Sequence, residues 1–109
     1  MYDHIGLRVK DMDSSIRFYE AVLAPLGYVL GPKGDGYAGF GPKDSPGLWL
    51  HAHKGPAVVG AHVAFKAPNR AAVERFHAVT TVCFRARSWA ERNLRIQEAG
   101  AAMVSCSSL

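Results

Sequence analysis

Two histidines occupy matching places in an internal repeat of this sequence. The stretch DHIGLRVKDMDSSIRFY contains His4 and aligns without a gap to AHVAFKAPNRAAVERFH, which contains His62. Imidazole is a common ligand of Zn²⁺, Ni²⁺, Fe²⁺ and Mn²⁺, and a bound ion can polarise a carbonyl or stabilise an enediolate. The pair therefore predicts a divalent metal site if the two copies face each other. A histidine at a strand start is also often only a hydrogen-bonded side chain near a turn, so both interpretations stay open.

Three further side chains are candidates for binding a substrate. Arg8 alternates with apolar neighbours in the same segment as His4, and this period of two places both on the polar face of a strand. Trp49 and His51 share a face of a later segment in the same way, and Trp49 is suited to lining a pocket for a flat or apolar molecule. His51 is also considered as a substitute metal ligand. Tyr37 is interpreted as a core or rim residue, and no residue is assigned a catalytic role.

The elements that position these residues follow the same order in both copies of the repeat. The alternating segment around His4 predicts a strand, and Asp11 then offers an N-cap for a helix over residues 12–24 that Pro25 ends. In the second copy another alternating segment is followed by Asn69, which caps a second helix. Each copy is therefore predicted to be a strand followed by a helix, and in the first copy Ile5, Leu7 and Val9 are expected to lie beneath the helix.

Three short pieces, YVL, YAGF and LWLHAH, lie between the two copies and are separated by segments rich in glycine and proline. This pattern predicts a small antiparallel meander. The 109 residues leave room for one small domain. We therefore expect an α+β fold in a single domain over 1–109. Residues 1–60 form a first βαβββ module, 61–80 begin a second module, and 81–109 are an atypical C-terminal segment.

The chain resembles the vicinal oxygen chelate superfamily, which includes glyoxalase I, bleomycin-resistance proteins and extradiol dioxygenases. The resemblance is carried by DHIGLRVKDMDSSIRFYEAVLAPLGY, by AGFGP followed by LWLHAHKG, and by HVAFKAPNRAAVERFHA, and it covers about residues 2–78. It implies two βαβββ modules that form a U-shaped cleft around a divalent metal, with His4 and His62 as ligands.

Three functions are compatible with this resemblance. The first is that of a metal-dependent lyase or dioxygenase acting on a small substrate with vicinal oxygens. The second is a non-catalytic protein that binds a small molecule or drug, in which the metal is absent. The third is a degenerate or frameshifted member of the family, whose remaining activity is to associate.

The C-terminal part departs from what the resemblance implies. Relatives take a metal-binding carboxylate from the last strand of a module, but the neighbourhood of Trp49 has no Asp or Glu, and the counterpart of Trp49 in the second copy is Ser107. In the tail, Ser88 and Glu91 form a capping-box pattern ahead of a helix-favouring run. The sequence thus predicts an incomplete second module with a helical tail that includes Leu94 and Ile96.

A shift of reading frame is one hypothesis for this departure. Codons for Val79, Thr80, Thr81 and Val82, displaced by one base, can encode Asp-Asp-Gly or Asp-Asn-Gly, which are turn sequences suited to a second module. Sequencing the gene and translating the neighbouring frame tests this hypothesis. A neighbouring frame without a strand pattern or a terminal Glu would remove it.

Composition limits the possible locations and partners. The hydrophobic content of 49% and charged content of 20% indicate a folded globular protein, and the sequence has no long uncharged apolar run for a membrane helix. The start MYDHIGLRVKD shows no export signal, so a cytoplasmic location with free Cys83 and Cys106 is expected.

The net charge of +4 raises the question of nucleic-acid binding. The arginines of the second half are spread among acidic and apolar residues without a basic stripe, so no nucleic-acid partner is expected. The expected partners are a small-molecule ligand and a second copy of the chain. A homodimer is predicted because the first module should expose an apolar sheet face that an incomplete second module cannot cover.

Overall fold

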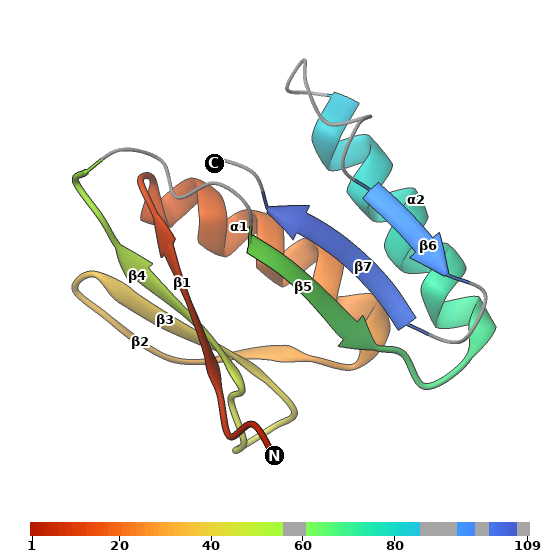
Figure 1. Cartoon of the computed structure of the whole chain (residues 1–109), viewed down its shortest axis with the longest axis horizontal. Coiled ribbons are helices and arrows are strands. Elements are labelled where there is room, and N and C mark those ends of the chain that lie inside the picture. Colours follow the sequence, from red (N-terminus) through yellow and green to blue (C-terminus); the bar gives the residue numbers. More distant parts are fainter. Residues whose placement is uncertain (56–60, 86–93, 98–100, 107–109) are drawn as a thin grey trace.

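The computed structural model describes residues 1–55, 61–85, 94–97 and 101–106, with two sheets and two long helices (Figure 1). The elements in chain order are β1 (Ile5–Val9), α1 (Met12–Leu23), the short 3-10 helix η1 (Ala24–Leu26), β2 (Val29–Gly34), β3 (Tyr37–Gly41), β4 (Leu48–Ala52), β5 (Ala61–Lys66), α2 (Arg70–Arg85), β6 (Leu94–Gln97) and β7 (Ala101–Cys106).

The first sheet has four strands in the order β1-β4-β3-β2. β1 runs parallel to β4, with Ile5 opposite Leu48, and the other neighbours are antiparallel. α1 packs on one face of this sheet (Figure 1). The fold is therefore α+β, and the strand, helix and meander predicted from the sequence form a βαβββ module.

Local side-chain caps fix where both long helices begin. The Asp11 carboxylate accepts a 3.0 Å hydrogen bond from the backbone N–H of Ser14, and the Asn69 side chain accepts one of 2.9 Å from Ala72. Each bond satisfies a backbone donor that the first turn of a helix leaves free. Gly27 follows η1 with a φ of 83°, a left-handed conformation that glycine adopts without steric cost. Both predicted N-caps are confirmed.

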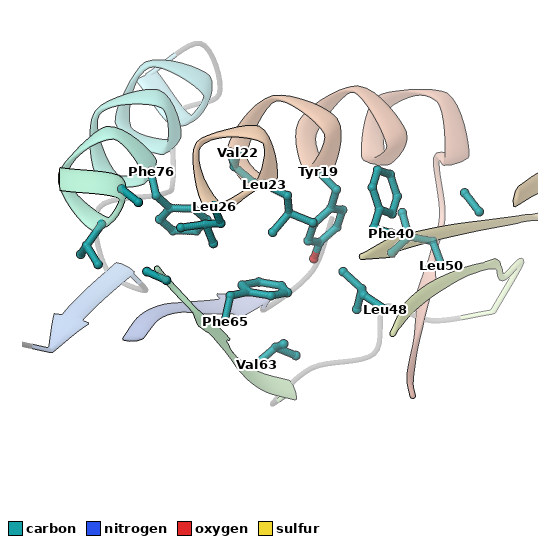
Figure 2. Packing of buried hydrophobic residues seen from close by; sticks show 14 of the residues in the cluster. Tyr19, Val22, Leu23, Leu26, Phe40, Leu48, Leu50, Val63, Phe65 and Phe76 are labelled. Carbon is teal, nitrogen blue, oxygen red and sulfur yellow. The ribbon is translucent and has the colours of Figure 1, made fainter. Parts of the chain in front are cut away.

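One apolar core joins the two strand-helix units. Tyr19 of α1 and Phe40 of β3 are both buried, with ring centroids 6.0 Å apart. Phe65 of β5 and Phe76 of α2 make a similar pair at 6.4 Å. Figure 2 shows these side chains meeting beneath α1. Burying an aromatic or aliphatic side chain of this size contributes about 1.5–3 kcal/mol, so this layer holds the units together.

Ile5 differs from its predicted environment. The alternation of β1 placed it beneath the helix, but its side chain is 43% exposed, whereas Val9 on the same face is buried. The reason is its position at the start of an edge strand, where the face of the sheet extends beyond the core. Ile5 therefore remains partly accessible to solvent.

The second sheet contains three described strands in the order β5-β7-β6, all antiparallel. In the first sheet three strands follow the helix, β3 reverses the direction of β2, and β4 reverses that of β3. The last strand, β4, therefore runs in the direction of β2 and parallel to β1. Two described strands follow α2, and β7 therefore runs opposite to β5. Among the described residues the second unit thus has a strand, a helix and two further strands, and its strand directions differ from those of the first module.

The predicted helical tail is wrong at Leu94 and Ile96, which lie in β6 and pair with β7. Their alternation with Arg95 and Gln97 has the period of a strand, and pairing with another strand overrides the helix propensity of the run. The capping box at Ser88 lies outside the described residues. α2 continues through the position of the hypothetical frameshift to Arg85.

Candidate functional site

The face of the first sheet opposite α1 gathers three of the sequence-predicted residues and one more. Arg8 of β1 is in register with His51 of β4, and His51 is in register with Tyr37 of β3. Trp49 lies two residues before His51 and so points to the same side. We call the surface made by Arg8, Tyr37, Trp49 and His51 the aromatic face.

Glycines form the floor of the aromatic face. A Cβ atom placed on Gly39 would lie 3.0 Å from the Trp49 ring, and one placed on Gly34 would lie 2.6 Å from the Tyr37 ring. On Gly6 it would approach the His51 ring at 3.5 Å. The three rings therefore lie against backbone that carries no side chain. The rings occupy space that side chains at these three positions would otherwise need.

The two largest rings of this surface lie close to each other. The ring centroids of Tyr37 and Trp49 are 6.3 Å apart at an interplanar angle of 45°. Tyr37 is 41% exposed, Trp49 is half-buried, and Arg8 and His51 are exposed. An exposed pair of aromatic rings offers a flat molecule stacking contacts, and Arg8 adds a positive charge beside them. The aromatic face is also more polar than the apolar sheet face that the sequence predicted.

The predicted metal ligands lie at the starts of the two strand-helix units. His4 directly precedes β1 and is exposed, with its Nδ1 atom 2.7 Å from the Oδ1 atom of Asp3. His62 is the second residue of β5, and its backbone pairs with Ser105. The side chain of His62 lies outside the described part of the structure. The predicted pairing of the two imidazoles stays a prediction.

The donor set for a metal is incomplete among the described residues. No group of three or more His, Cys, Asp or Glu is placed there to hold an ion. His51 has Arg8 in register beside it, and a fixed positive charge on the same face disfavours a cation. The role of His51 as a substitute ligand stays a prediction, and His4 with Asp3 offers one nitrogen and one carboxylate that are accessible.

The sequence interpretation missed Tyr37 as a member of this surface. It lies at the start of β3, and its position opposite His51 depends on the register between β3 and β4. The available signal was the spacing of Tyr37, Gly39 and Gly41 in YAGFG, which puts one aromatic residue and two glycines on one face. Glycine within a strand often marks a place where another group approaches closely.

The βαβββ module, followed by a second strand-helix unit, defines the class of fold to which the chain belongs. The chain belongs to the Glyoxalase/Bleomycin resistance protein/Dioxygenase superfamily, whose family model matches residues 2–91. The match extends past residue 78, at which the resemblance seen in the sequence ends. A comparison with curated proteins found no match. No helix among the described residues combines the length and the apolar composition that a membrane span requires.

Proposed function

We propose that the protein binds a small planar anion on the aromatic face without turnover. The observation that carries this proposal is the glycine floor, which leaves the Tyr37 and Trp49 rings against the backbone and partly exposed. Stacking on such rings favours a flat ligand, and shape alone would accept a neutral or a charged one. Arg8 favours an anion because its guanidinium always carries a positive charge and binds carboxylates with two hydrogen bonds.

Fluorescence titration with 2,3-dihydroxybenzoate tests this proposal. This probe is planar, carries a carboxylate and has two vicinal oxygens. The chain has two tryptophans, so replacing Trp89 by Phe leaves Trp49 as the reporter. Saturable quenching is expected for this probe, weaker quenching for neutral catechol, and none for cyclohexanecarboxylate, which is not planar.

Matched variants identify the residues that bind the probe. Arg8→Gln is expected to weaken binding of the carboxylate by about tenfold, as loss of a charge-assisted hydrogen bond does. Lys10→Gln removes an equal charge from an exposed residue just beyond β1 and should leave binding unchanged. Equal quenching by the planar and the non-planar acid would remove the proposal.

A second candidate function is that of a metal-dependent lyase or dioxygenase acting on a vicinal-oxygen substrate. It is supported by the equivalent places of His4 and His62 at the starts of the two strand-helix units. A divalent ion bound there would act as a Lewis acid on the substrate oxygens. In this chain, His4 and His62 would hold the ion and Asp3 would orient or supplement His4.

Metal analysis distinguishes the second candidate from the first. Stoichiometric Zn, Ni, Fe or Mn is expected in purified protein if the site exists. Replacing His4 or His62 by Ala should then lower metal affinity at least about tenfold, while His77→Ala on α2 should not. Protein that contains no stoichiometric ion and gains none on dialysis against these metals contradicts this candidate.

We also propose that the protein forms a homodimer in the cytoplasm. Support for a dimer comes from the aromatic face, which no described element of the same chain covers, and from the second sheet, for which only three strands are described. In such a dimer the small ligand would lie between the two copies of the aromatic face. A degenerate member of the family would keep this association without binding a ligand, so failure of the probe together with a stable dimer would favour that alternative.

A further inference from the structure

A cavity of about 240 Å³ lies between the helix-covered side of the first sheet and β5. Figure 2 shows Val63 and Phe65 of β5 beneath α1, across from Leu48 of the first sheet. The apolar part of the wall is made by Ile5, Leu23, Phe40, Leu48, Val63 and Phe65. Of these residues Ile5 is exposed, so it lies at the opening, and the others are buried.

This cavity is separate from the aromatic face. Leu48 lines the cavity, and the next residue, Trp49, belongs to the aromatic face. Successive side chains of a strand point to opposite sides of its sheet. A molecule in the cavity therefore does not touch the site proposed above, and the two sites can be tested independently.

The Tyr28 hydroxyl is a polar side-chain group of the wall whose geometry is fixed by a hydrogen bond. Tyr28 lines the cavity, and its hydroxyl donates a 2.6 Å hydrogen bond to the main-chain oxygen of Lys66. Because the hydroxyl proton is used in this bond, the Oη atom still has lone pairs with which it can accept a hydrogen bond. The wall thus combines a mostly apolar surface with a side-chain acceptor at Tyr28.

The size of the cavity limits what it can hold. An apolar cavity of roughly 150 Å³ can stay dry and bind benzene, and the present one is larger by about the space of a second fused ring. It is bounded by α1, the first sheet and β5 and is open on the side of Ile5, so a compact molecule can enter from that side. Pockets of this kind take their specificity from a few polar groups in an apolar wall.

We propose that the cavity binds a compact aromatic molecule of one or two rings that carries one hydrogen-bond donor. The ring lies against Leu48 and Phe65, and the donor bonds to the Oη atom of Tyr28. Indole matches this description, and benzene matches it without the donor. This inference does not depend on the proposed function of the aromatic face.

Calorimetric titration of the whole chain with indole and with benzene tests the inference. Saturable binding of one molecule per chain is expected for both probes. Tyr28→Phe should lower the affinity for indole about fivefold, because it loses one hydrogen bond, and should leave benzene binding unchanged. Trp49→Ala on the aromatic face should leave both unchanged.

Two variants block the cavity from different sides. Ile5→Trp adds bulk at the exposed opening, and Val63→Phe adds bulk from β5. Each should lower indole affinity about tenfold or more, because little free volume remains. Val29→Trp is the control, since Val29 is an exposed apolar residue of 48% exposure that does not line the cavity. Circular dichroism of each variant establishes that it is folded.

Three results would overturn the inference. The first is the absence of saturable binding up to the solubility limit of indole. The second is unchanged indole affinity in both folded blocking variants. The third is indole affinity that falls as protein concentration rises, with a doubled mass that Ile5→Trp abolishes. This third result would show that a second copy of the chain covers the cavity.

Discussion

The hydroxyl of Tyr28, just before β2, donates a 2.6 Å hydrogen bond to the main-chain oxygen of Lys66, the last residue of β5. This bond links the first sheet's module to the first strand of the second unit. It satisfies a carbonyl at the end of β5, where the strand ladder stops. Tyr28 is therefore a point at which packing between the two units can be measured with a single substitution.

Replacing Tyr28 by Phe should lower the free energy of unfolding by about 1 kcal/mol, because the ring stays and the hydrogen bond is lost. Urea denaturation measures this difference. Tyr2→Phe is the matched control, since Tyr2 is 82% exposed, and it should have no effect. Equal stability of Tyr28→Phe and wild type would contradict the role given to this bond.

The pH dependence of stability should also report on Tyr28. Burial raises the pKa of its hydroxyl above the ordinary value of 10.0. Below pH 10 both folded and unfolded chains keep the proton, so the stabilisation is fully present. As pH rises from there through the higher folded pKa, the unfolded chain loses the proton first, and stability falls. The free energies of unfolding of wild type and Tyr28→Phe should therefore converge between pH 9 and pH 11. A difference that stays constant over this range would contradict the assignment.

The two helix caps should contribute equally and independently. Asp11→Ala and Asn69→Ala each remove one side-chain acceptor for a backbone N–H at a helix start, and each should cost about 1 kcal/mol of unfolding free energy. Glu20→Ala, an exposed change inside α1, is the control. The double variant should lose as much unfolding free energy as the two single variants together. A much smaller loss would show that the caps are coupled.

The glycine floor should be sensitive at one position and tolerant at a neighbouring one. In Gly39→Ala the new methyl group lies 3.0 Å from the Trp49 ring, so the ring must move. We expect a shift in Trp49 emission and about tenfold weaker binding of 2,3-dihydroxybenzoate. In Gly31→Ala the nearest atom is a backbone oxygen at 3.7 Å, an ordinary contact, and both observables should stay as in wild type.

Sedimentation equilibrium at micromolar concentration tests the proposed homodimer. A mass of about twice the 11.8 kDa of the chain is expected. Trp49→Lys should abolish association, because it places a desolvated charge in the proposed interface. Lys33→Gln, an exposed change in β2, should not alter the mass. A wild-type mass near that of one chain refutes the dimer.

Features that depend on a few neighbouring residues could be predicted from the sequence. Asp11 and Asn69 cap helices through bonds that reach three residues along the chain, and both were predicted correctly. The shared face of Trp49 and His51 follows from strand period alone. Tyr37 required the register between two strands, which no local pattern specifies. Leu94 was misassigned because its strand state depends on pairing with β7.

The predicted metal pair likewise combines a local feature, which the sequence predicts, with a distant contact, which it does not. The repeat predicts equivalent places for His4 and His62; in the structure His4 directly precedes β1, and His62 is the second residue of β5. Whether two side chains from separate units meet depends on how the units pack. That packing is set by distant contacts such as the one between Phe65 and Phe76, which the repeat does not encode.

β4 is an inner strand of the first sheet, between β1 and β3, although it is the last of the four to be synthesised. On the ribosome the β2-β3 hairpin can form while β1 still has no partner, because Ile5 pairs with Leu48. Bringing β1 and β4 together closes the chain segment between Ile5 and Leu48. This closure costs conformational entropy before the two strands gain any hydrogen bonds, and it therefore slows folding. During refolding, amide hydrogens of β2 and β3 should thus become protected from exchange before those of β1, and arrival of β4 completes the sheet in one step.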